Sequence, residues 1–197
     1  MKALPFVWPY ALVFWLTYSW SFASEYRIVS RAMEGVRDSG SPDRGSLRLL
    51  LGAQTLALMV AIALSAFRVW QFPTRLLLPL FALGITLLLL GSLIRRYCHR
   101  TLGEYFTGDV RVRSDQPVIR SGPYRLVRHP SYTGGMLIFV GIGFALGSVL
   151  GLILLAVITL VGYGYRVAVE ERALVAAIGE PYRVYMTECK RFIPYIV

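Results

Sequence analysis

The chain has 197 residues, of which 56% are hydrophobic and only 16% are charged, and its formal net charge is +10. This length suits one domain, and the composition lies outside the usual range of soluble proteins, so the first expectation is a membrane protein. The positive charge does not require nucleic acid, because basic cytoplasmic loops give a membrane protein the same excess. We therefore expect no nucleic-acid partner.

Four long stretches contain no Asp, Glu, Lys or Arg: residues 3–24, 49–67, 76–94 and 131–165. A helix needs about 20 apolar residues to cross roughly 30 Å of hydrocarbon, so each of the first three stretches predicts one transmembrane helix. The fourth would extend for roughly 50 Å as a single helix, so we expect it to fold back on itself. Its middle contains small residues that would let two antiparallel helices turn and approach closely. These residues are Gly141, Gly143, Gly147, Ser148 and Gly151.

The sequence thus predicts an all-α, polytopic membrane protein with about five transmembrane helices, the last two forming a helical hairpin. In this arrangement eighteen of the 21 lysines and arginines and all eleven acidic residues fall on one face. Only Lys2, Arg68 and Arg75 fall on the other. Since cytoplasmic loops carry the excess of Lys and Arg, we predict that the crowded face is cytoplasmic and the N-terminus is outside. Cys98 and Cys189 then lie on the cytoplasmic face, where a disulfide is not expected.

The first stretch could instead be a secretory signal peptide, because Lys2 precedes it and residues 21–23, Ser-Phe-Ala, fit a cleavage site. Cleavage would leave the arginine-rich connector that follows on the outside, against the charge rule, so we expect a retained span. Residues 1–94 then form a three-span hydrophobic scaffold. Residues 95–197 carry the chemistry, within one structural domain overall.

The second region begins with a basic stretch at residues 95–100, which we expect to continue the third helix and extend its arginines toward lipid phosphates. Residues 103–122 predict irregular structure or a small hairpin. Pro130 either stops a helix or occupies the first turn of the next one. The fifth helix is expected to run from about residue 152 to residue 178, because Gly179 and Pro181 are stop signals.

Polar side chains concentrate just before and at the start of the fourth span, where residues 122–134 read GPYRLVRHPSYTG. The unpaired backbone N–H groups and the positive dipole end of a starting helix favour an anionic ligand group, and Arg128 would add charge there. The alternative is that Arg128 and His129 only anchor the helix at the interface, while Tyr124 and Tyr132 join an aromatic belt.

A second polar group lies at the cytoplasmic end of the fifth span. Arg166 and Glu170 are four residues apart and share a helix face, so they can pair near the hydrocarbon boundary. The alternative is an ordinary interfacial salt bridge beside a solvated Glu171. The segment 179–195 alternates aromatic and cationic side chains, which suits a segment lying on the membrane surface.

Three sharper motifs can be set aside. The sequence Gly141-Ile-Gly143 lacks the preceding strand and the third glycine of a dinucleotide site. Cys98-His99 lacks a second ligand pair, so no metal site is predicted. No aspartate follows Asp115 to complete a Ser-His-Asp arrangement with His129.

The order and spacing of the polar elements resemble the isoprenylcysteine carboxyl methyltransferase family. The pattern covers residues 93–195, about half of the chain, and phospholipid N-methyltransferases look like more distant relatives. Its parts are Gly-Pro-Tyr at 122–124, Arg-His-Pro-Ser-Tyr-x-Gly at 128–134, Arg166 with Glu170-Glu171, Gly-x-x-Tyr-x-x-Tyr at 179–185 and Ile-Pro at 193–194.

The resemblance implies a cytoplasmic C-terminal cofactor-binding region for S-adenosylmethionine, made without a Rossmann domain, and a lipophilic acceptor that enters from the bilayer. Arg166 would be the catalytic residue, because its guanidinium could orient an acceptor carboxylate. A carboxylate is already nucleophilic, whereas an amine would need a base, and no well-placed base is evident. The residues that the resemblance assigns to the cofactor are Gln116, Pro117, Val118, Ile119, Tyr124, His129, Pro130, Ser131, Tyr132, Glu170 and Glu171.

The expected reaction is therefore methyl transfer to a lipophilic carboxylate of isoprenoid or prenylated type at the cytoplasmic membrane face, with membrane lipids as further partners. Another lipid carboxylate stays open, because nothing in the sequence indicates a cell that prenylates proteins. An NADPH-dependent enzyme resembling the sterol reductases is an alternative, since they share an Arg-His-x-x-Tyr-x-Gly pattern and a similar tail. Pro130 and the pair Glu170-Glu171 resemble the methyltransferase form of this shared pattern rather than the reductase form. A non-enzymatic lipid-binding membrane protein is the third possibility.

Overall fold

The computed structural model describes residues 3–35, 45–105 and 117–193 of the chain. Within these ranges the regular structure is helical, with two isolated β-bridges, which confirms the predicted all-α class. The long helices are α1 (Tyr10–Gly35), α2 (Ser46–Ala66), α3 (Thr74–Leu102), α4 (Pro130–Leu146) and α5 (Val149–Ile178). The short helices are η1 (Leu4–Phe6), η2 (Gly103–Tyr105), η3 (Gly122–Arg125) and α6 (Glu180–Glu188). The central part of the hairpin predicted at residues 103–122 lies outside the described residues.

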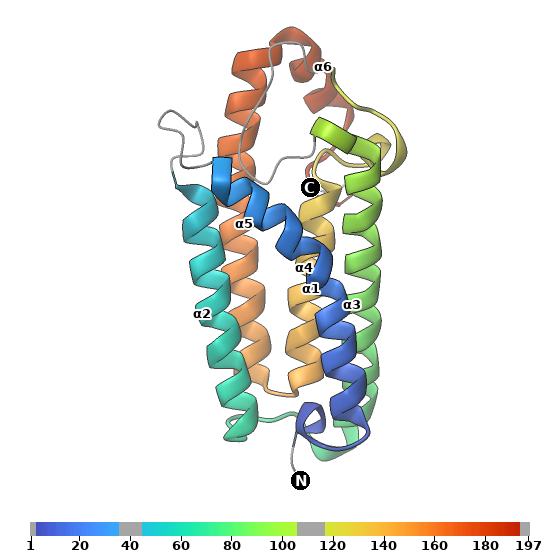
Figure 1. Ribbon diagram of the computed structural model, residues 1–197, viewed down its shortest axis with the longest axis vertical. Helices are drawn as coiled ribbons and strands as arrows, with labels where there is room; N and C mark the ends of the chain where they lie inside the picture. The colour runs from blue at the N-terminus through green and yellow to red at the C-terminus, as the bar shows by residue number, and fades with distance from the viewer. Residues whose placement is uncertain (1–2, 36–44, 106–116, 194–197) are drawn as a thin grey trace.

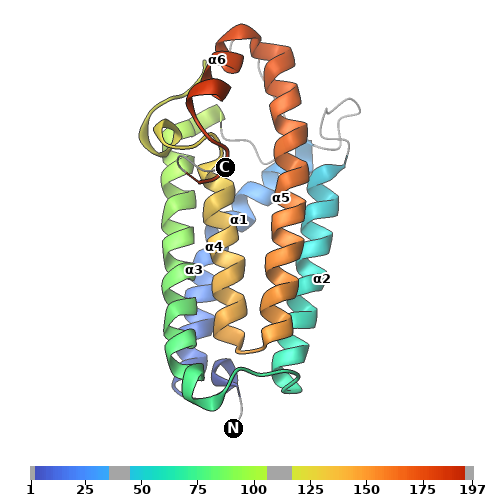
Figure 2. The ribbon, with the colours of Figure 1, turned by 180° about the vertical axis from the view of Figure 1, so that it is seen from behind.

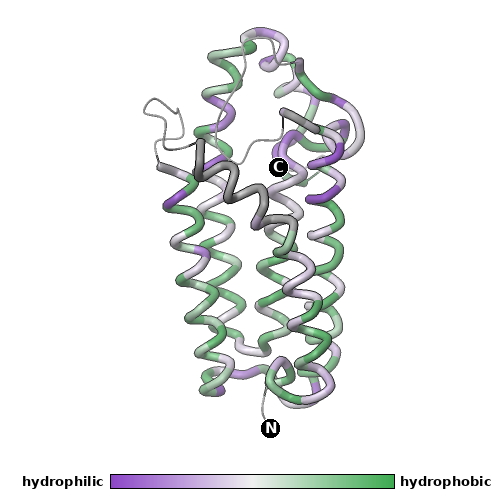
Figure 3. Tube along the Cα trace, in the orientation of Figure 1, coloured by the Kyte–Doolittle hydropathy of each residue, from purple (hydrophilic) through white to green (hydrophobic). Residues whose placement is uncertain are grey.

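The long helices lie side by side and alternate in direction (Figures 1 and 2). The turn between α4 and α5 is at one end of the bundle, and η3 and α6 are at the other. α4 packs against both α3 and α5, α2 packs against α5, and α1 slants across the bundle. Hydrophobic residues dominate the long middle part of the helix bundle, whereas polar residues gather around α6 and the neighbouring ends of α3 and α5 (Figure 3).

Among the described residues, α2, α3 and α5 are long and apolar enough to cross a membrane, and α4 is a shorter apolar helix of 17 residues. A polytopic membrane fold is therefore confirmed. The total of about five crossing helices stays a prediction.

The fourth charge-free stretch folds back as predicted, at a turn built from small residues. Gly147 ends α4 with a φ of +75°, in the left-handed region that glycine adopts without a Cβ clash. Ser148 then caps α5, because its side-chain oxygen accepts the Gly151 N–H at 3.2 Å. Because of this turn, the start of α4 and the end of α5 lie at the same end of the bundle (Figure 2).

Two glycine pairs bring α3 and α4 into backbone contact. A Cβ on Gly84 would lie 2.5 Å from the Gly141 carbonyl oxygen, and a Cβ on Gly91 would overlap the Gly134 carbonyl oxygen. Such close approach gives dense van der Waals packing where lipid supplies no hydrophobic driving force between helices. The expectation that Gly141 serves the α4–α5 hairpin was wrong, because Gly141 faces α3 and Gly143 faces α5.

α4 begins below the ends of its two neighbours. Arg95 of α3 donates to Ser131 O at 3.0 Å and to Ser131 Oγ at 3.1 Å, which places Arg95 level with the first turn of α4. From that level α3 continues to Leu102, and α5 continues from Glu171 to Ile178, which is about 10 Å in each case. η3 and α6 occupy the space above the start of α4 (Figure 1).

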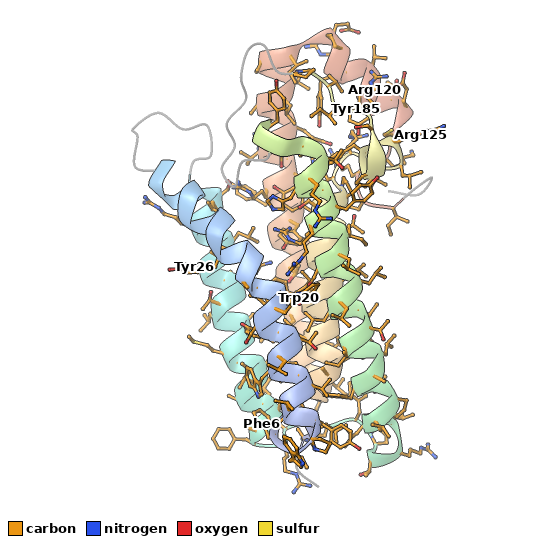
Figure 4. All side chains as sticks on the ribbon, turned by 45° about the vertical axis from the view of Figure 1, so that its right-hand side comes forward. Phe6, Trp20, Tyr26, Arg120, Arg125 and Tyr185 are labelled. Carbon is orange, nitrogen blue, oxygen red and sulfur yellow. The ribbon has the colours of Figure 1, made fainter. Side chains whose placement is uncertain are left out.

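Two arginines at the end of α3 bind protein rather than lipid phosphates. Arg96 Nη2 donates to the Trp20 carbonyl at 2.7 Å, and its guanidinium lies 3.7 Å from the centroid of the Trp20 ring. Trp20 lies on the part of α1 that passes α3 (Figure 4). The expectation that these side chains extend toward phosphates was wrong for Arg95 and Arg96, because α4 and α1 supply acceptors at the same level.

We predict that Gly84→Ala destabilises the protein by about 1–3 kcal/mol, because the added methyl group would be forced against the backbone of α4. Gly52→Ala on α2 is the matched control, since a Cβ at Gly52 meets nothing within 4 Å. Thermal unfolding of both variants in detergent checks this. Equal midpoints for the two variants would show that α3 and α4 do not pack through Gly84.

Candidate functional site

A buried carboxylate, Glu171 of α5, joins three parts of the chain. Its Oε1 accepts from Arg128 Nε at 3.0 Å and lies 3.3 Å from His129 Nε2. Its Oε2 accepts from Arg191 Nε at 3.1 Å and from Arg191 Nη2 at 2.7 Å. The Glu171 side chain is only 5% exposed, so the possibility of a solvated Glu171 was wrong. We call Glu171, Arg128, His129 and Arg191 the Glu171 cluster.

Two features hold the C-terminal segment against the start of α4. The backbone N–H groups of Arg128 and His129 donate to the carbonyls of Lys190 and Arg191 at 2.8 Å and 2.9 Å. Arg128 Nη1 also donates to the carbonyls of Met186 and Cys189. The Arg128 side chain and the two backbone N–H groups before α4 therefore bind groups of this chain. The sequence predicted an external anion at this position. The anion that Arg128 meets is Glu171.

Arg191 is the member of the Glu171 cluster that faces solvent, with 47% of its side chain exposed. The hydrogen bonds that it donates to the Glu171 carboxylate raise the pKa of Arg191 above its usual value. Arg191 therefore stays protonated, and its side chain lies between the buried carboxylate and solvent.

A second cluster lies on the neighbouring face of α5, between α4 and α2. Tyr132 Oη donates to Glu170 Oε2 at 2.8 Å. Arg166, one turn deeper and 3% exposed, donates from Nη1 to Ser46 Oγ of α2 at 2.7 Å. Glu170 and Tyr132 are only partly buried, in contrast to Arg166. We call Tyr132, Glu170, Arg166 and Ser46 the Glu170 cluster.

Tyr163 belongs beside this cluster, although it was not among the predicted site residues. Its ring centroid lies 4.9 Å from that of Tyr132, and the ring packs on Gly135, where any Cβ would overlap the phenol. The sequence carried a signal, because Tyr163 precedes Arg166 by three residues and Glu170 by seven, which places all three on one helix face.

η3 and α6 are tied together above the start of α4. Tyr185 Oη donates to the Tyr124 carbonyl at 2.5 Å, which joins two of the motifs singled out in the sequence. Burial raises the pKa of the Tyr185 hydroxyl above its usual range, so the proton that it donates stays in place. Arg120 pairs with Glu188 of α6 at 2.5 Å and lies 5.3 Å from the Tyr185 ring centroid (Figure 4). α6 therefore packs against η3, and its Tyr182 and Tyr185 are buried.

The predicted cofactor residues divide into three groups. Tyr124, Pro130, Ser131, Tyr132 and Glu170 lie around the start of α4 and the facing part of α5. His129 and Glu171 lie there too, but their side chains bind each other within the Glu171 cluster. Pro117, Val118 and Ile119 lie in the irregular segment that leads to Arg120 and η3. Gln116 lies outside the described residues.

The two clusters offer different chemistry. In the Glu171 cluster the buried carboxylate is fully paired with cations and donors of the chain itself, which suits a structural role. The Glu170 cluster combines a partly exposed carboxylate, a phenol and a buried guanidinium, with the Tyr163 phenol beside it, which suits recognition of one cationic and one anionic group side by side. Within the described parts of the chain, no three His, Cys, Asp or Glu side chains gather to hold a metal ion.

The chain is similar to membrane methyltransferases. The sequence profile of the phospholipid methyltransferase family matches residues 79–180. Protein-S-isoprenylcysteine O-methyltransferase B of Arabidopsis thaliana is 28% identical over 115 residues, which cover 57% of this chain and 58% of the relative. The protein-S-isoprenylcysteine O-methyltransferase of Saccharomyces cerevisiae is 29% identical over 116 residues, covering 58% of this chain and 48% of the relative. The chain thus spans about half the length of the curated relatives that it matches.

A solved structure has the same fold. The eukaryotic intramembrane Ras methyltransferase, an isoprenylcysteine carboxyl methyltransferase, superposes with a TM-score of 0.63 at 24% sequence identity. The superposition covers 73% of this chain and 51% of the other.

We predict that Glu171→Gln destabilises the protein by about 3–5 kcal/mol, because it leaves Arg128 buried without its counter-charge. Glu188→Gln is the control. The partner of Glu188, Arg120, is 42% exposed, so Glu188→Gln should lower the free energy of unfolding by less than about 1 kcal/mol. Chemical denaturation in detergent micelles compares the two, and an equal loss in both variants would contradict a structural role for the Glu171 cluster.

Proposed function

The chain belongs to the phospholipid methyltransferase family, and from this premise we propose that it acts as the isoprenylcysteine O-methyltransferases it resembles do, methylating a lipophilic carboxylate with S-adenosylmethionine as the methyl donor. The observation that carries the proposal is the Glu170 cluster. It places a carboxylate, Glu170, and a buried guanidinium, Arg166, on one face of α5, at the end of the bundle where η3 and α6 pack. A methyl donor with a positive sulfonium and an acceptor with a negative carboxylate need these two opposite charges.

The residues near the start of α4 fit such a cofactor. Glu170 is partly exposed, so its carboxylate can attract the cationic part of the cofactor, and Tyr132 fixes its orientation through a hydrogen bond of 2.8 Å. Tyr124, Pro130 and Ser131 would contribute the surrounding surface. When bound, S-adenosylmethionine supplies an activated methyl group. We assign His129 and Glu171 to positioning, because they hold the C-terminal segment beside this surface.

Arg166 would bind the acceptor carboxylate. It is 3% exposed and is held by Ser46, so its guanidinium is already ordered and largely desolvated before an acceptor arrives. A buried guanidinium attracts a carboxylate more strongly than an exposed one does, because less water competes. The chain thus contributes orientation and exclusion of water, which are what a direct methyl transfer requires.

The charge distribution supports an orientation of the chain in the membrane. The end that carries η3, α6 and both clusters also carries most of the Lys and Arg residues, so we assign it to the cytoplasm. S-adenosylmethionine would reach the site from this side, and the acceptor would reach it from the bilayer. The relatives are named for S-isoprenylcysteine, and we take a prenylated or other isoprenoid carboxylate as the acceptor class.

We predict that the purified protein binds S-adenosylhomocysteine and does not bind NADPH, as isothermal calorimetry in detergent would show. Tyr132→Phe should weaken S-adenosylhomocysteine binding by about three- to tenfold, because it removes the hydrogen bond that orients Glu170. Tyr97→Phe, on the exposed side of α3, is the control and should bind as the parent does. Binding of NADPH without binding of S-adenosylhomocysteine would favour the alternative of a reductase.

For Arg166→Ala, we predict a loss of about 10- to 100-fold in turnover of S-farnesylcysteine, with little change in S-adenosylhomocysteine affinity. The reason is that the lost guanidinium would bind the acceptor and not the cofactor. Transfer of radiolabelled methyl groups measures the first quantity, and calorimetry measures the second. Parallel losses in both would leave Arg166 with a structural role only.

A further inference from the structure

Two buried polar side chains outside the clusters face the seam between α2 and α5. Three contacts define this seam, with Ser46 against Arg166, Leu50 against Gly162, and Ala61 against Gly151. The residue numbers of each pair add to the same value, as expected for antiparallel helices in register. Gln54 and Thr159 lie at one level of the seam, between the second and third of these contacts.

Both side chains hold polar atoms without a hydrogen-bond partner in the part of the chain that the structure describes. These atoms are Gln54 Nε2 and Thr159 Oγ1, in residues that are 6% and 1% exposed. Both residues lie on helices apolar enough to cross the membrane. A polar atom buried at this depth without a partner lowers stability, and an intramembrane polar residue of this kind points to a functional site.

The hydroxyl of Thr159 differs from the hydroxyls of three other helical threonines of this protein. Threonine in a helix commonly donates to the carbonyl four residues earlier. Thr17, Thr86 and Thr101 do so at 2.7 Å, 2.9 Å and 3.0 Å. Thr159 does not, although a standard helix surrounds it. Its hydroxyl therefore stays available to a group beside the helix.

The position of the pair relative to Arg166 defines which part of an acceptor it could meet. Thr159 precedes Arg166 by seven residues, or two helical turns, and so lies about 10 Å deeper in the membrane. A chain whose carboxylate binds Arg166 would run along this seam toward Gln54 and Thr159, and it would displace the Leu50 side chain that packs on Gly162.

We propose that Gln54 and Thr159 form a specificity site for an uncharged oxygen, carbonyl or hydroxyl, located about 10 Å along the lipid chain from the acceptor carboxylate. The amide N–H of Gln54 and the hydroxyl of Thr159 can both donate to one such oxygen, which has two lone pairs. This inference rests on the proposed function and narrows its substrate class. The favoured acceptor is an oxygenated lipid carboxylate rather than one with a purely hydrocarbon chain.

The test uses two S-alkylcysteines of equal chain length, one plain and one with a keto oxygen about 10 Å from the carboxylate. The parent protein should methylate the keto compound with a kcat/KM about three- to tenfold higher than that of the plain compound. Gln54→Leu and Thr159→Val should each abolish this preference while still methylating the plain compound. Thr86→Val is the matched control, because the Thr86 hydroxyl is satisfied within α3 on the lipid-exposed side, and it should keep the preference.

A second measurement separates a ligand site from a purely structural pair. In detergent without either S-alkylcysteine, the Gln54→Leu variant should unfold at a higher temperature than the parent, because the substitution removes an unsatisfied N–H from the interior. Equal kcat/KM values for the two compounds in the parent, or an unchanged preference in both seam variants, would overturn the site and leave the methyltransferase assignment intact. If the parent methylates neither compound, the proposed function fails. Stabilisation of the parent by the keto compound alone, seen in thermal unfolding, would still support the site, and equal stabilisation by both compounds would exclude it.

Discussion

The burial of Glu171 is the constraint on which the end of this structure that carries η3 and α6 depends. A carboxylate at 5% exposure is stable only when cations and donors surround it. Its partners come from the segment before α4 and from the segment after α6, so satisfying one charge fixes the relative positions of three parts of the chain. The adjacent Glu170 then lies on the neighbouring face of α5, where it accepts from Tyr132 and does not contribute to that network.

The packing of the helices creates the place for this network. The glycines of α3 and α4 allow the two backbones to touch, and the turn at Gly147 returns α5 along the other side of α4. Because α4 is short, the longer neighbours rise past its first turn and the C-terminal elements can close over it (Figure 1). The catalytic proposal therefore requires the fold-back, the short helix and the buried carboxylate together.

The sequence predicted much of this arrangement, and its failures have physical causes. The length of the fourth charge-free stretch was enough to predict the reversal, since hydrocarbon thickness limits a span. The same reversal brings the start of α4 beside the end of α5, where Tyr132 donates to Glu170. Helical periodicity could not decide which partners Glu171 finds, because Arg191 lies in an irregular segment with no fixed phase. The contact of Arg166 with Ser46 joins residues 95–197, the predicted chemical region, to residues 1–94, the predicted scaffold. Residue spacing within either region could not predict a contact between them.

The shortness and burial of α4 have a consequence for how the protein responds to bilayers of different thickness. The side chains of α4 are buried or only partly exposed, so lipid chains contact mainly the other long helices. Helices that do not match the hydrocarbon thickness adjust by tilting, or the bilayer deforms around them. Such adjustments act on the outer helices, while the polar first turn of α4 keeps its depth relative to α3 and α5. The depth of the candidate site is thus set by protein contacts, and hydrophobic mismatch would alter the tilt of the molecule before it altered the geometry of the site.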